Sequence, residues 1–129
     1  MPRCVLLAAA LTAALALALP AAAQVQRNFP ATALRGTLEV TQPPEVLLNG
    51  APARLAPGAR IRGTDNLLQM SGRLLGQRYV VDYTLDIGGL VMDVWLLTPQ
   101  EAARQPWPTT PAQAAAWRFD PLAQTWSRP

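Results

Sequence analysis

The sequence predicts an all-β fold. The expected architecture is a small antiparallel meander or partly open barrel, SH3-like or OB-like, followed by a short C-terminal helix and a Pro/Trp-rich tail. Three observations predict it. Short segments separated by Gly, Pro and Asn turns fill residues 34–76, and residues 77–97 have the pattern of one long hairpin. Residues 106–129 then hold five prolines and three of the four tryptophans.

The first strand and hairpin follow from alternation and from one turn dipeptide. Residues 34–41 alternate between apolar or small and polar side chains, and Pro43-Pro44 ends this strand. Asn49-Gly50 suits a two-residue hairpin turn because both residues tolerate positive φ. That turn places Glu45 opposite Arg54, a pairing worth about 0.2–1 kcal/mol. Pro57-Gly58 predicts a type II turn, after which ARIRG and LLQMSG form two further short segments.

Residues 77–97 predict the core hairpin. A two-residue turn at Gly88-Gly89 and a four-residue loop over 86–89 both give the same parity. Either loop collects one wholly apolar face, which must be buried: Tyr79, Val81, Tyr83, Leu85, Leu90, Met92, Val94 and Leu96.

The two loops differ in where they put the aspartates of the hairpin. The four-residue loop sets Asp82 opposite Asp93, where the two carboxylates could share a proton or bind a hard cation such as calcium. The Gly-Gly turn sets Asp82 opposite Trp95 and avoids this repulsion. We prefer the Gly-Gly turn, with both aspartates facing solvent and neither in a metal site.

Three elements are expected after the hairpin. Thr98, Pro99 and Glu101 form a capping box, which predicts a short helix through Arg104. Thr110-Pro111 can cap another brief helix through Trp117, and residues 117–126 suit a small hairpin. The expected domain organisation is a β domain with its helix over 24–104 and the tail over 105–129.

Residues 1–23 predict a secretory signal peptide. A short positive start with Arg3 precedes an apolar run over 5–19, and the small residues Ala21 and Ala23 occupy the −3 and −1 positions of a cleavage site before Gln24. The run is short for a membrane span, and no later apolar stretch is long enough to cross a membrane. We therefore expect cleavage between Ala23 and Gln24, and a periplasmic or, alternatively, secreted product.

The composition of residues 24–129 excludes several classes of chemistry. This stretch contains no His and no Lys, and the one cysteine of the sequence, Cys4, precedes it. Ser-His and Cys-His catalysis, zinc binding and a lysine-bearing phosphate loop are therefore excluded. The net charge is only +2, which does not indicate a nucleic-acid partner. The sequence predicts a protein that is not an enzyme and has no cofactor.

Two phrases resemble a known group. RLAPGARIR (54–62) and DVWLLTPQEAA (93–103), joined by a Tyr-rich strand and a Gly turn, resemble a group of small exported proteobacterial proteins of uncharacterised function. The resemblance covers roughly residues 34–103. It implies export and a compact β domain, and it carries over no catalytic or binding residues.

Two sets of residues are candidate sites. Arg54, Arg60 and Arg62 are candidates for binding an anion, although they also suit a solvated strand face whose charges are answered by acids from residues 79–103. The aromatic residues of the tail either pack over the barrel or bind a partner: Trp107, Trp117, Phe119 and Trp126. The favoured function is a non-catalytic envelope module that binds a protein partner or has a structural role. The alternative is a binder of anionic glycan or lipid head groups through the arginines.

Overall fold

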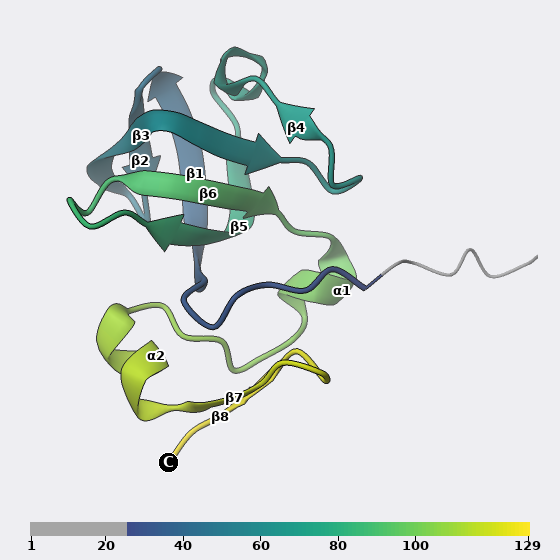
Figure 1. The fold of residues 1–129 in the computed structure, drawn as a ribbon. Helices are drawn as coiled ribbons and strands as arrows, with labels where there is room; N and C mark the ends of the chain where they lie inside the picture. The colour runs from purple at the N-terminus through teal and green to yellow at the C-terminus, as the bar shows by residue number, and fades with distance from the viewer. Residues whose placement is uncertain (1–25) are drawn as a thin grey trace, which may run out of the picture.

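The computed structural model describes residues 26–129, which form a β-barrel and a second layer packed beneath it (Figure 1). The predicted signal peptide and its cleavage site at Ala23 and Gln24 lie outside the described residues. No helix among residues 26–129 is long and apolar enough to span a membrane.

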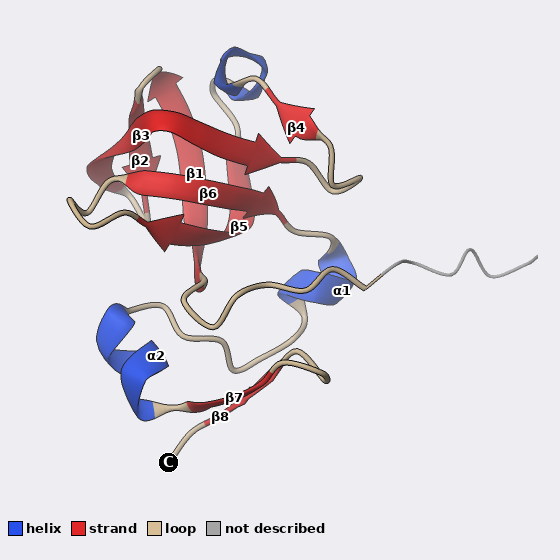
Figure 2. Ribbon diagram, in the orientation of Figure 1, coloured by secondary structure: helices blue, strands red, loops and turns tan. Residues whose placement is uncertain are grey.

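Five strands close the barrel, which confirms the all-β prediction (Figure 2). A meander of β1 (Leu34–Gln42), β2 (Glu45–Leu48) and β3 (Ala51–Arg62) is joined by the hairpin of β5 (Arg78–Leu85) and β6 (Val91–Leu96). β5 pairs with β1, and β6 pairs with β3 in parallel, so the sheet is mixed, and of the two predicted forms, meander and barrel, the barrel is the one found. A meander whose third strand pairs in parallel with the last barrel strand is the OB-like arrangement, which decides between the two predicted barrel types.

The β2–β3 hairpin has the predicted turn and register. Asn49 and Gly50 have φ of 54° and 79°, as a two-residue turn of this kind requires. Glu45 lies opposite Arg54, and their side chains form an exposed ion pair at 3.4 Å.

The predicted turn at Pro57-Gly58 is absent, because β3 runs through it without reversing. Gly58 has φ of 77°, and the pairing with β6 shifts register between Leu55 and Arg60. This is a bulge rather than a turn. The first part of β3 pairs with β2 and the second part with β6 and β4 (Leu68–Gln69), so the bulge lies where the strand changes partners.

The β5–β6 hairpin keeps the predicted parity over most of its length. Asp82 lies opposite Trp95 and Tyr83 opposite Val94, as the Gly-Gly turn required. The turn itself has three residues, 87–89, with Gly89 at φ of 82° and a bulge that restores the register. The bulge places Val91 in the core at 0% exposure in place of Leu90 and Met92, and it leaves Leu85 exposed.

Apolar side chains from every barrel strand fill the interior. The buried cluster also takes in Leu74 of the 3-10 helix η1 (Ser71–Leu74). Its members are Leu34, Leu38, Val40, Val46, Leu55, Ile61, Leu74, Val81, Tyr83, Val91, Val94 and Leu96.

The tail forms a second core against the outside of the barrel. α1 (Pro99–Ala102) precedes the tail, which comprises α2 (Pro111–Ala116), β7 (Arg118–Asp120) and β8 (Thr125–Ser127). The capping box at Thr98 and Glu101 is present, although the helix ends at Ala102 rather than Arg104. Figure 1 shows the N-terminal segment running between the barrel and this layer. The second core contains Phe29, Ala33, Trp107 and Trp126, with Trp95 and Leu97 of the barrel packed against it.

Candidate functional site

The structure divides the three predicted anion-binding arginines into two groups. Arg54 pairs with Glu45 at 3.4 Å on the β2–β3 hairpin. Arg60 and Arg62 both approach Asp93 of β6, at 3.1 Å and 3.9 Å. Each arginine has an acid within 4.0 Å, but Arg60 and Arg62 share Asp93, and no single site brings all three together.

The predicted aromatic residues of the tail pack against the protein instead of being exposed for a partner. Trp107 and Trp126 are each 5% exposed, and the Trp107 indole donates a hydrogen bond to the carbonyl of Ala33 at 3.1 Å. The rings of Phe119 and Trp126 stack with centroids 4.7 Å apart. Of the four, Trp117 and Phe119 are half-buried. Packing, one of the two alternatives for these residues, is the arrangement found.

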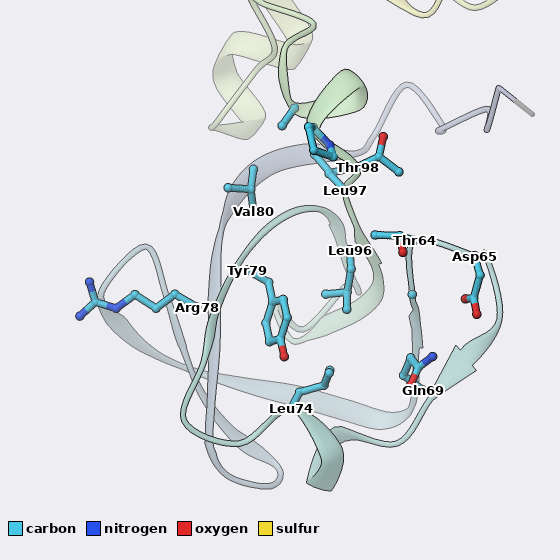
Figure 3. Close-up of a pocket in the computed structure, with 13 residues that line it drawn as sticks. Thr64, Asp65, Gln69, Leu74, Arg78, Tyr79, Val80, Leu96, Leu97 and Thr98 are labelled. Carbon is cyan, nitrogen blue, oxygen red and sulfur yellow. The ribbon is translucent and has the colours of Figure 1, made fainter. Parts of the chain in front are cut away.

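A cavity opens at the end of the barrel where β5 begins and β6 ends. We call it the barrel mouth, and its volume is about 520 Å³. Figure 3 shows Leu74, Tyr79 and Leu96 pointing into it from three different elements, while Arg78 extends away. A cavity of this size, mainly apolar and at the mouth of a barrel, is a typical place for a ligand group to bind.

Three polar side chains of the barrel mouth come from the β3–β4 connection and from β4. Thr64, Asp65 and Gln69 lie along one side of the cavity (Figure 3). One Asp65 oxygen accepts the backbone N–H of Leu67 at 3.0 Å, and no cation lies within ion-pair distance of Asp65 among residues 26–129. On the other side, the Tyr79 hydroxyl donates to Gln77 at 2.9 Å. Asp65 is therefore an uncompensated charge at an apolar opening.

Five exposed apolar side chains lie on or next to the elements that line the barrel mouth, and one of them, Val80, lines the cavity itself. We call these residues the apolar rim: Leu67 (64% exposed), Leu68 (66%), Met70 (75%), Leu75 (50%) and Val80 (46%). β4 is the end strand of the sheet and pairs only with β3 among the described residues. A concentration of large apolar side chains beside a cavity and a strand edge is characteristic of an interaction surface.

A more polar cavity of about 710 Å³ adjoins the barrel mouth and shares Thr64, Asp65 and Thr98 with it. Its wall contains the buried ion pair of Arg27 and Glu101, which also ties the N-terminal segment to α1. Burial would raise the pKa of Glu101, but hydrogen bonds from Arg27 and from the backbone of Thr98 outweigh burial and hold the pKa below its ordinary value. This pair fixes the position of α1 at the edge of the barrel mouth.

The outer face of β1 and β5 carries a buried ion pair that contradicts the prediction of a solvent-facing Asp82. Asp82 is 0% exposed, and Arg35 Nε donates to it at 3.0 Å. Burial raises the pKa of Asp82 to about 6, against the opposing effect of Arg35. Arg35 also donates to the carbonyl of Arg104 at 2.7 Å and lies 4.7 Å from the ring of Trp107. The tail covers this face of the barrel, so Asp82, which the strand pattern placed toward solvent, is buried.

The residues of the barrel mouth were not singled out from the sequence. The available signal was two leucine pairs, Leu67-Leu68 and Leu74-Leu75, in a segment without strand alternation. Only the fold brings this segment beside Tyr79 and Leu96.

Within residues 26–129, no group of three or more His, Cys, Asp or Glu side chains has the placement of a metal site. The comparisons with known proteins were negative: no family model, no curated protein and no solved structure matches this chain.

Proposed function

We propose that this protein is an exported, non-catalytic envelope module that binds a protein partner at the barrel mouth. The observation that carries the proposal is the apolar rim, five exposed side chains on or next to the elements that line an apolar opening of about 520 Å³. Partner proteins commonly anchor an interface by burying one large side chain in such an opening.

The chemistry of the site defines the partner segment that it fits. Leu74, Tyr79 and Leu96 provide an apolar cavity for one side chain, and the free edge of β4 offers backbone groups to an extended chain. Asp65 lacks a cation, so it complements a lysine or arginine beside the inserted side chain. The proposed partner therefore presents an extended segment with an apolar residue next to a basic one.

Export rests on the N-terminal sequence. The charged start, the short apolar run and the small residues before Gln24 together support a cleaved signal peptide. Mass spectrometry of the periplasmic and extracellular fractions should find a mature N-terminus at Gln24. An intact Met1 terminus on the folded protein would contradict export.

Affinity capture with matched variants tests the binding function. The immobilised protein is exposed to an envelope extract of the source organism, next to Leu68→Glu in the apolar rim and Ile87→Glu at the opposite hairpin turn. Both side chains are exposed, at 66% and 109%, so neither substitution should disturb the core. The wild-type protein and Ile87→Glu should retain the same partner, and Leu68→Glu should lose it.

The response to salt separates the proposed contact from ionic binding. An apolar contact at the rim should survive a rise in ionic strength from about 0.05 M to about 0.5 M, whereas ionic capture by arginines should be lost. Capture that Leu68→Glu leaves unchanged, or that salt abolishes, would contradict binding at the barrel mouth.

A further inference from the structure

The parallel pairing of β3 and β6 builds a compact set of four side chains on the outside of the barrel. Arg60 lies opposite Asp93, and Arg62 lies opposite Trp95. Residues two apart on one strand share a face, so the four side chains form a square of two arginines, one carboxylate and one indole.

This square carries one excess positive charge. Arg60 Nε lies 3.1 Å from Asp93 Oδ1, and Arg62 Nη1 lies 3.9 Å from the same oxygen, beyond hydrogen-bond distance. The other Asp93 oxygen accepts the Thr84 hydroxyl at 3.3 Å. Asp93 is the one acid paired with either arginine among the described residues, so one guanidinium charge stays uncompensated.

A shallow hollow of about 550 Å³ lies over the square. The N-terminal segment forms part of its wall and contributes Asn28, while Asn66 contributes a second amide from the β3–β4 connection. Arg27 also reaches the hollow, but its charge is neutralised by Glu101. The arginine side chains remain accessible there, with 53% of Arg60 and 27% of Arg62 exposed.

We propose that this hollow binds an anionic sugar residue. Its carboxylate or phosphate group accepts hydrogen bonds from Arg60 and Arg62, whose guanidinium forks match such oxygens. Trp95 lines the hollow and offers an apolar ring surface to the sugar, and the side chains of Asp93, Asn28 and Asn66 pair with its hydroxyls. The hollow shares no lining residue with the barrel mouth, so it adds a ligand to the proposed function.

Nitrogen-15 NMR titration of the chain from Gln24 tests the proposal with D-glucuronate as the probe. D-glucose has the sugar ring without the charge, whereas acetate and inorganic phosphate have the charge without the sugar ring. We expect glucuronate to shift the Trp95 indole N–H signal with a dissociation constant on the order of 1 mM, and the other three probes to bind at least about tenfold more weakly. Glucose binding equally well would remove the role of the charge. Acetate or phosphate binding equally well would reduce the site to a general anion site, and either result would overturn the proposal.

Variants on the same strand provide the matched comparison. Arg62→Gln should weaken glucuronate binding at least about tenfold, whereas Arg54→Gln, which removes an arginine paired with Glu45, should leave it within about twofold. If Arg62→Gln fails to fold, Arg60→Gln takes its place, because that side chain is more exposed. An equal loss in Arg54→Gln, or the absence of binding by the wild-type protein, would refute the site. Neither result bears on capture of a protein at the apolar rim.

Discussion

Arg35 and Asp82 lie opposite each other on β1 and β5 and form an ion pair that the tail covers. Arg35 Nε is 3.0 Å from Asp82 Oδ1, and the two side chains are 10% and 0% exposed. Arg35 also donates to the carbonyls of Ala102 and Arg104 and lies under the ring of Trp107. One side chain therefore joins the barrel wall, the end of α1 and the second core.

Removing the arginine of this pair should be costly. Arg35→Met keeps apolar contact with Trp107 but leaves Asp82 buried without its cation, so we expect the free energy of unfolding at neutral pH to fall by about 3–5 kcal/mol. Arg54→Met is the control, because its pair with Glu45 is exposed and should contribute only about 0–1 kcal/mol. Urea denaturation measures both. Equal losses in the two variants would show that the buried pair has no special role.

Asp82 should also make stability depend on pH. Its pKa rises from 3.8 to about 6 on folding, mainly through burial, so the folded protein binds this proton more tightly than the unfolded chain does. The resulting stabilisation is complete below pH 3.8 and is lost as the pH rises through about 6. The pKa difference corresponds to about 3 kcal/mol, at about 1.4 kcal/mol for each pH unit.

Comparison of the wild-type protein with Asp82→Asn isolates this contribution, because asparagine does not titrate. Between about pH 4 and about pH 7, the free energy of unfolding of the wild-type protein should fall relative to that of the variant by about 2.5 kcal/mol. Glu101 acts in the opposite sense, since its pKa is lowered and its contribution is lost only as the pH falls below 4.5. A difference between the two proteins that does not change with pH would show that Asp82 titrates normally.

Local patterns in the sequence predicted the turns and parities correctly where neighbouring residues decide them. Asn49-Gly50 and the pairing of Glu45 with Arg54 needed only the preferences of a two-residue turn. The opposition of Asp82 and Trp95 followed from the preference for the Gly-Gly turn, which keeps Asp82 away from Asp93. The three-residue turn and its bulge were missed, because a bulge barely alters the pattern of apolar and polar residues. This bulge nevertheless moves Val91 into the core.

Long-range packing explains what was not predicted. Asp82 was expected to face water because alternate strand residues usually do, and nothing near it in sequence indicates that Trp107 returns over that face. The same limit applies to Pro57-Gly58, which bends β3 between two partners instead of reversing the chain. The barrel mouth requires η1 to lie beside β5 and β6, an arrangement that follows only from closure of the barrel.

Truncation after Arg104 should leave a folded but less stable barrel. It removes Trp107 and Trp126, and burial of each contributes about 1.5–3 kcal/mol. We expect the Tm to fall by about 10 °C or more, and the tryptophan emission of the intact protein to be blue-shifted. Truncation after Trp126 is the control, because residues 127–129 are exposed and should contribute little. An unchanged Tm in the longer truncation, together with solvent-like emission, would contradict packing of the tail.

Site-specific photocrosslinking tests partner binding at the barrel mouth most directly. A benzophenone amino acid replaces Leu68 in the apolar rim or, as the control, Leu122 in the β7–β8 turn, which is 90% exposed. After irradiation in the intact envelope, position 68 should yield one discrete adduct whose partner peptide is extended, with an apolar residue next to lysine or arginine, and position 122 should yield none. Equal adducts at both positions, or only crosslinks to a second copy of this chain at position 68, would contradict the proposed function.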